Sequence, residues 1–270
     1  MTSAYDAVPG LLITKQDQVL RLTFDLAERR NALNDEVLGA TIDAIDAAGR
    51  DEDIRVIVLT GSGADFCSGF DIVSRNAGGG ARPRVGSIQR RLPAQAHRLI
   101  PLMLRTQVPI VSVVRGWAAG IGLNLALASD FTVAAEDARF WAPFVGKGFT
   151  PDSGATWMLP RRIGEVRARD MLLLGRVVSG AEAAEWGMVH RAVPAEELEL
   201  AADELVATLA AAPTVALGLA KWLLNSGRDK ALDDQLHDEA FSMELSSRSD
   251  DFKEGLAAFK EKRPPQYKGR

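Results

Sequence analysis

Short apolar runs alternate with a helical pattern over the first half of the chain. LLIT (11–14) and VLRLTF (19–24) flank the polar residues KQDQ, and this pattern predicts a β-hairpin. Residues 34–49 carry apolar side chains at helical spacing. Three further apolar runs have the length of buried strands: 55–60, 108–116 and 130–135. The alternation predicts an α/β fold whose strands are buried on both faces.

From Glu196 onward the pattern becomes helical. Segments 196–212, 215–226 and 231–247 each carry an apolar stripe at helical spacing. Such stripes either pack on the protein's own core or are buried against another subunit, and the pattern fits both interpretations. We therefore expect a core formed by residues 1–194 and a helical oligomerisation region formed by residues 195–270.

Composition narrows the class of protein. The 270 residues are 47% hydrophobic and 25% charged, with a net charge of -4, so we expect neither a nucleic-acid partner nor a membrane surface. No apolar run approaches the ~20 residues that cross a bilayer. The single cysteine, Cys67, and an N-terminus without a signal-peptide pattern predict a cytoplasmic location.

Two glycine-rich segments each stand between a strand and a helix: GADFCSGFDI (63–72) and GWAAGIGLNLALASD (116–130). Backbone N–H groups at helix starts lack intrahelical acceptors, so two converging groups would form an oxyanion hole. Neither segment matches the phosphate-loop or the dinucleotide-binding pattern. A third glycine-rich stretch, 77–84, is either a mobile segment over a pocket or an ordinary surface loop.

One acid stands alone in apolar surroundings. In FTPDSGATWMLP (149–160), Asp152 lies among Phe149, Trp157 and Met158. A carboxylate in such company costs free energy unless it is paired, hydrogen-bonded or required for chemistry. It is therefore either an acid–base group or the cap of a helix that starts near Ser153. The histidines show no metal-ligand spacing, so we expect no metal.

Taken together, motifs along nearly the whole chain resemble the crotonase (enoyl-CoA hydratase/isomerase) superfamily. They are RRNALN (29–34), FCSGFDI (66–72), GWAAGIGLNLALASDFTVAA (116–135), GRVVSGAEAAEWGMVHRAVP (175–194) and EGLAAFKEKRPPQYKG (254–269). PDSGATWMLPRRIG is similar to ring-epoxyphenylacetyl-CoA isomerases, and dienoyl-CoA isomerases also have an aspartate at that place. The resemblance implies a spiral of β-β-α units followed by a C-terminal helical trimerisation region, and a homo-trimer or hexamer.

The resemblance also implies roles for individual residues. The N–H groups of Phe70 and Ile121 would form the oxyanion hole, and Asp152 would be the catalytic acid–base group. The substrate would be an acyl-CoA thioester, with coenzyme A as part of the substrate and no separate cofactor. Six residues would contact the coenzyme A portion, the last two from a neighbouring subunit: Arg30, Ala32, Ser68, Ile72, Phe259 and Lys262. Three would line the substrate pocket: Asn124, Trp141 and Phe144.

The chain departs from hydratases at two positions. A standard enoyl-CoA hydratase of this family uses two glutamates, and their positions here hold Asn124 and Phe144. Two carboxylates are needed to activate and protonate a water, so efficient hydration is not expected. The leading hypothesis is an enzyme that shifts the double bond of an enoyl-CoA by proton transfer through Asp152. The alternatives are a hydratase with atypical acid–base residues and a non-catalytic acyl-CoA binding protein.

Overall fold

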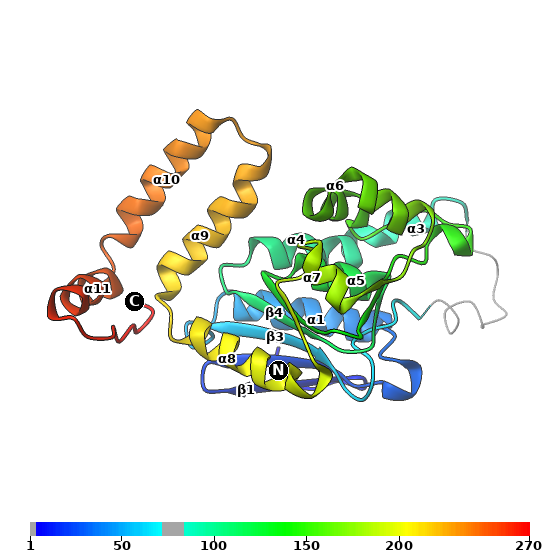
Figure 1. The fold of residues 1–270 in the computed structure, drawn as a ribbon, viewed down its shortest axis with the longest axis horizontal. Coiled ribbons are helices and arrows are strands. Elements are labelled where there is room, and N and C mark those ends of the chain that lie inside the picture. The colour runs from blue at the N-terminus through cyan, green and yellow to red at the C-terminus, as the bar shows by residue number, and fades with distance from the viewer. Residues whose placement is uncertain (1–3, 72–83) are drawn as a thin grey trace.

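The computed structural model describes residues 4–71 and 84–270. Ile72 and residues 77–83 of the glycine-rich stretch, for which the sequence gives expectations, lie outside the described residues. Figure 1 shows the described chain as a sheet with helices packed on it and a helical C-terminal region that extends away from it.

The main sheet has six strands in the order β1-β2-β3-β4-β6-β9. They are β1 (Leu11–Gln16), β2 (Val19–Phe24), β3 (Val56–Gly61), β4 (Ile110–Val114), β6 (Phe131–Ala135) and β9 (Arg191–Val193). β1 pairs with β2 antiparallel as the predicted hairpin, and every other pair is parallel. β3 and β4 are buried along their whole length, as their continuous apolar runs predict.

A second, three-stranded sheet was not predicted. It contains β5 (Trp117–Ala119), β7 (Arg139–Trp141) and β8 (Val178–Ser179); β5 pairs with β7 parallel, and β7 with β8 antiparallel. The sequence predicts no strand at residues 116–120, because three apolar residues between glycines are too few for a strand pattern. In the structure, β5 forms the first part of the second glycine segment.

The helices of the core follow the strands. They are α1 (Asp35–Ala48), α3 (Ser87–Arg91), α4 (Ala96–Arg105), α5 (Ile121–Ala128), α6 (Ala155–Leu173) and α7 (Gly180–Glu185). Short 3-10 turns lie at η1 (Ala27–Arg29), η2 (Leu92–Ala94) and η3 (Val145–Lys147). Helices α3 and α4 are separated at η2, which contains Pro93. Asn34 caps α1 by accepting a hydrogen bond from the Val37 N–H at 2.8 Å.

The C-terminal region comprises η4 (Ala195–Glu197), α8 (Leu198–Ala210), α9 (Thr214–Ser226), η5 (Gly227–Asp229), α10 (Leu232–Ser246) and α11 (Asp250–Glu261). Helix α8 packs on β3, β4 and β6, so its apolar stripe belongs to the protein's own core. Helices α9 and α10 form a hairpin that rises away from the sheet, and α11 lies beyond it (Figure 1).

Helices α10 and α11 expose large apolar side chains. Phe241 and Met243 are 60% and 62% exposed, and Phe259 is 87% exposed. In the single chain, therefore, the stripe on α10 is not covered by the protein's own core. Of the described helices, none alone is long and apolar enough to cross a membrane; one pair, 195–210 with 214–229, meets the length and composition together but bends by 107°.

Candidate active site

The turn that follows β2 is tied to the first glycine segment by a buried asparagine. Arg30 and Asn31 both have left-handed backbone conformations, with φ of 52° and 54°. The Asn31 Oδ1 accepts from the Leu26 N–H at 2.8 Å, and its Nδ2 donates to the carbonyls of Ser62 and Asp65 at 2.9 and 2.6 Å. Asn31 lies inside the motif RRNALN, but no role for it is predicted from the sequence.

Three of the predicted coenzyme A residues lie together. The Ser68 N–H donates to the Arg30 carbonyl at 2.9 Å, and Ala32 is half-buried on the same turn. The Arg30 side chain is mainly exposed, with its Nε 3.8 Å from Asp65 Oδ2. This turn and the first glycine segment therefore present one surface with a cationic side chain on it.

The remaining two, Phe259 and Lys262, are not brought to this surface within one chain. The tail that follows α11 docks on Arg55, whose Nη1 donates to the Tyr267 carbonyl at 3.3 Å. Arg55 comes directly before β3, whereas the first glycine segment begins after the other end of that strand. The tail thus lies at the opposite end of β3 from the first glycine segment, which contains Ser68.

The two glycine segments run side by side. The Cys67 N–H donates to the Trp117 carbonyl and the Ala119 N–H to the Cys67 carbonyl, both at 2.9 Å, which makes a parallel bridge between Cys67 and Ala118. A side chain at Gly122 would overlap the Cys67 carbonyl oxygen, so this close approach requires glycine. A Cβ at Gly120 would lie 3.7 Å from the Gly69 Cα, so the two glycine segments are also in contact next to the bridge.

Phe70 and Ile121 each follow one of these two contacting glycines. Gly69 and Gly120 have φ of 116° and 56°, and Gly120 is held by a hydrogen bond from its N–H to the Trp141 carbonyl at 3.0 Å. Ile121 is the first residue of α5, where an N–H has no intrahelical acceptor. Its side chain is buried, so it can offer only its backbone to a ligand. The predicted oxyanion donors are thus on adjacent stretches of backbone.

Asp152 is half-buried in the turn that leads into α6. Burial raises the pKa of its carboxyl group, while a hydrogen bond from the Ser153 hydroxyl to Oδ1 (3.0 Å) and the charge of His97 act in the opposite direction on that pKa. Helix α6 begins at Ala155 with Gly154 as N-cap and has no side-chain cap. The interpretation of Asp152 as a helix cap is therefore wrong.

Of the three predicted pocket residues, Asn124 is bonded to Asp152, and the other two contact other parts of the chain. Asn124 is fully buried and its Nδ2 donates to the Asp152 carbonyl at 3.1 Å. Phe144 is buried edge-on against Phe149, with ring centroids 5.7 Å apart. The Trp141 indole N–H donates to the Gly175 carbonyl at 2.9 Å. The backbone carbonyl of Trp141 accepts the hydrogen bond from the Gly120 N–H.

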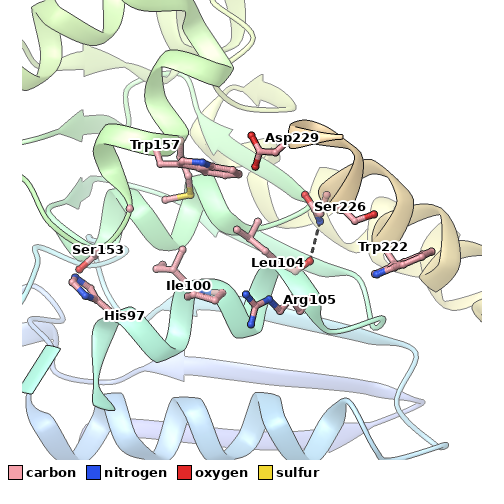
Figure 2. Close-up of a pocket in the computed structure, with 13 residues that line it drawn as sticks. His97, Ile100, Leu104, Arg105, Ser153, Trp157, Trp222, Ser226 and Asp229 are labelled. Atoms are coloured by element: carbon pink, nitrogen blue, oxygen red, sulfur yellow. Dashed lines mark hydrogen bonds between the residues drawn. The ribbon is translucent and has the colours of Figure 1, made fainter. Parts of the chain in front are cut away.

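A cavity of about 640 Å³ opens beside the Asp152 turn, between α4, the start of α6 and α9 (Figure 2). Ser153 and Gly154, which follow Asp152, form part of its wall, and Figure 2 shows His97 facing Ser153. Asn225 on α9 donates to the Leu104 carbonyl on α4 at 3.0 Å and holds that wall in place. His97 has no role among the sequence-based predictions, and no pattern in the sequence indicates that α9 approaches α4.

The described residues include no cluster of three or more histidine, cysteine or acidic side chains able to hold a metal ion. The site instead combines two adjacent glycine segments, a carboxyl group whose pKa is raised by burial, and a largely apolar cavity next to the turn that holds this carboxyl group. Such a site can stabilise a developing oxyanion and move a proton.

Comparison with known proteins agrees with this geometry. Residues 14–270 match the family model described as "Enoyl-CoA hydratase/isomerase". The chain is 40% identical over 254 residues to the 1,2-epoxyphenylacetyl-CoA isomerase of Escherichia coli K12, covering 93% of this chain and 95% of the relative. It is 37% identical over 269 residues to a "Probable enoyl-CoA hydratase" of Rhodobacter capsulatus, covering 100% and 98%.

The fold agrees as well. The crystal structure of an enoyl-CoA hydratase from Bacillus anthracis matches with a TM-score of 0.90 at 30% identity, over 97% of this chain and all of that one. The predicted spiral fold and the resemblance are both confirmed. The chain belongs to the enoyl-CoA hydratase/isomerase family and is an acyl-CoA enzyme of the crotonase superfamily.

Proposed function

We propose that this enzyme shifts the double bond of an enoyl-CoA by proton transfer through Asp152. The proposal rests on where carboxylates are present and absent. Asp152 is joined through Asn124 to the helix that begins at Ile121. The two positions that hold glutamates in hydratases hold uncharged residues in this chain. One acid–base group suits an isomerisation, in which a proton leaves one carbon and returns to another.

In this mechanism the Phe70 and Ile121 N–H groups bind the thioester oxygen. Asp152 removes a proton from the acyl chain, and the negative charge moves onto that oxygen as an enolate. Backbone donors fixed in advance stabilise such a charge without reorganising. Asp152, now protonated, returns the proton to a different carbon. Burial of Asp152 supports this role, because it raises the carboxyl pKa and makes the protonated form accessible.

The acyl group would extend past Ser153 into the cavity. Its volume of about 640 Å³ lies within the range of small-molecule pockets, roughly 300–1,000 Å³. Ile100, Leu104, Trp157 and Met158 give it an apolar wall. This lining favours a bulky apolar acyl group, in keeping with the printed name of the E. coli isomerase.

The coenzyme A portion would lie along the surface formed by Arg30, Ala32 and Ser68. Phe259 and Lys262 would reach it from a neighbouring subunit of a trimer or hexamer. Two observations support that assignment: the tail docks at the opposite end of β3 from Ser68, and Phe259 is 87% exposed in the single chain.

A hydratase with atypical acid–base residues is the second candidate, and the likeness to the Rhodobacter capsulatus protein favours it. The two candidates act on different substrates and predict opposite changes in ultraviolet absorbance. Hydration removes the double bond conjugated with the thioester and lowers its ultraviolet absorbance. Conversion of a 3-enoyl-CoA to a 2-enoyl-CoA creates that conjugation and raises the absorbance.

The decisive experiment compares Asp152→Asn with wild type on 3-enoyl-CoA and 2-enoyl-CoA. We expect isomerisation to fall by ~10²–10⁴-fold, the usual value of general acid–base catalysis, with acyl-CoA affinity nearly unchanged. Asp229→Asn is the control, because Asp229 is an acid that lines the cavity but has no proton to move in this mechanism. Full isomerase activity in Asp152→Asn would overturn the proposal.

A further inference from the structure

Asn124 is an interior polar residue that joins α5 to the turn before α6. It is fully buried, and its Nδ2 donates to the Asp152 carbonyl at 3.1 Å. The same carbonyl accepts from the Ala155 N–H at 3.1 Å, at the start of α6. One side chain therefore fixes the peptide of Asp152 relative to the helix whose first residue is Ile121.

The orientation of the Asn124 amide follows from this bond. A carbonyl oxygen only accepts hydrogen bonds, so the atom that faces it must be the amide nitrogen. The Oδ1 then points elsewhere, and among the described residues it has no hydrogen-bond partner although it is buried. An apolar side chain would avoid this unmet acceptor. Packing alone does not explain an asparagine here, whereas a requirement for its N–H donor does.

The turn held by Asn124 needs such an anchor. Ser153 and Gly154 both have left-handed conformations, with φ of 51° and 84°. Serine rarely adopts this conformation, and strain of this kind persists only where the surroundings fix it. The Ser153 hydroxyl donates to Asp152 Oδ1 at 3.0 Å. Asn124 thus holds the peptide of Asp152, and Ser153 holds one oxygen of its carboxylate.

We propose that Asn124 is a positioning residue, whose Nδ2 sets the Asp152 carboxylate at a fixed place relative to the Ile121 N–H. This inference rests on the proposed function, because it gives Asp152 the acid–base role. Asn124 and Ile121 are three residues apart on α5, so they lie on the same face of that helix. Helix α5 then carries both one oxyanion donor and the anchor of the acid–base group.

A consequence is that an acid at position 124 and the present placement of Asp152 exclude each other. A carboxylate there has no donor for the Asp152 carbonyl and would bring negative charge against its oxygen. Introducing a hydratase-type glutamate would therefore displace Asp152 as well as add an acid.

The test uses Asn124→Asp, which keeps size but loses the donor, and Asn124→Ala. We expect kcat for 3-enoyl-CoA isomerisation to fall by roughly 10²-fold in both, since misplacement of a catalytic group by about 1 Å has that effect, with KM little changed. In Asn124→Asp the acidic limb of the pH–rate profile should also move to higher pH, because the new carboxylate disfavours ionisation of Asp152.

Thr132→Val is the matched control. The Thr132 hydroxyl is buried and donates to the Ala126 carbonyl of the same helix at 2.7 Å, so this variant also removes a buried hydrogen bond of α5. We expect it to keep the kcat of wild type. An equal loss of kcat in Thr132→Val would assign the effect to general disturbance of α5 and overturn the inference.

Asp152→Asn, measured beside these variants, separates the two proposals. If Asp152→Asn loses activity while both Asn124 variants keep the kcat of wild type, the positioning role is wrong and the proposed function stands. If Asp152→Asn keeps full activity, the proposed function fails and the positioning role fails with it.

Discussion

The Asp152 carboxyl group is subject to opposing effects from its surroundings. Burial raises its pKa, while the Ser153 hydroxyl and the charge of His97 lower it. In the proposed mechanism the ionised form takes the proton, so kcat/KM should fall as pH drops through this raised pKa. Ser153→Ala removes a bond to the ionised form and should move the acidic limb of the profile to higher pH.

His97→Gln should move the limb in the same direction by a different route. Loss of a nearby positive charge also disfavours the ionised carboxylate. This shift should shrink as salt is added, because a Debye length of about 8–10 Å near 0.1–0.15 M screens an exposed histidine. The shift in Ser153→Ala should not depend on salt. Profiles at low and high salt check both, and a His97→Gln profile identical to wild type at low salt would contradict the pairing.

Sequence alone identified some residues of this site and missed others for physical reasons. Asp152 was recognisable because a lone acid among aromatic side chains is costly. The roles of Asn31, His97 and Asn124 were not recognisable, because each depends on an interaction with a residue distant in sequence. Asn31 bonds to the Asp65 carbonyl, Asn124 bonds to the Asp152 carbonyl, and the charge of His97 acts on the Asp152 carboxyl group. A periodic pattern reports which face of an element is apolar, and it does not report which residues meet across the core.

Strands also differ in how far the sequence predicts them. β3 and β4 were predictable because both faces are buried and their runs are continuously apolar. β5, with three residues, leaves no periodic signal, and its partner β7 lies beyond the whole of α5 and β6. The second sheet therefore arises from tertiary pairing that a local reading cannot detect.

Helix α9 is attached to the main sheet by a buried ion pair. Lys221 Nζ lies 2.7 Å from Asp130 Oδ2 and donates to the Val108 carbonyl at 3.0 Å. Burial raises the pKa of Asp130 and lowers the pKa of Lys221, so each charge depends on the other. Lys221→Met should lower the free energy of unfolding by about 3–5 kcal/mol, because it leaves the carboxylate buried without its partner. Urea denaturation measures this.

The double variant Lys221→Met/Asp130→Asn tests that cause. It removes both charges, and the asparagine oxygen can still accept from the Ile110 N–H, which binds Asp130 at 2.8 Å. Most of the lost stability should return. A double variant no more stable than Lys221→Met would show that the unpaired carboxylate is not responsible.

The whole molecule leaves a large apolar surface on its C-terminal helices. Leu232, Phe241 and Leu256 are each more than half exposed, along with Phe259. Apolar surface of this extent marks an interaction site. We predict a trimer or a hexamer at micromolar concentration, measured by sedimentation equilibrium. A monodisperse monomer under those conditions would contradict both the assembly and the assignment of Phe259 and Lys262 to a neighbour's coenzyme A.

A charge at the surface should dissociate the assembly. Phe241→Glu places a negative charge on α10. Because Phe241 is 60% exposed in the single chain, the variant should still fold. Leu12→Glu on β1 is the control, with 46% exposure at the edge of the main sheet. The first variant should shift the distribution toward smaller species and the second should not.

The bridge between the two glycine segments has a consequence for how long their amide protons survive in heavy water. The N–H groups of Cys67 and Ala119 are hydrogen-bonded within a buried stretch of chain, although both lie in sequences rich in glycine. They should exchange for deuterium as slowly as the amides of β3 and β4, that is, only when the molecule opens globally. Fast exchange at either would contradict this. In the proposed mechanism, a thioester oxygen would bind beside a backbone that stays closed from one turnover to the next.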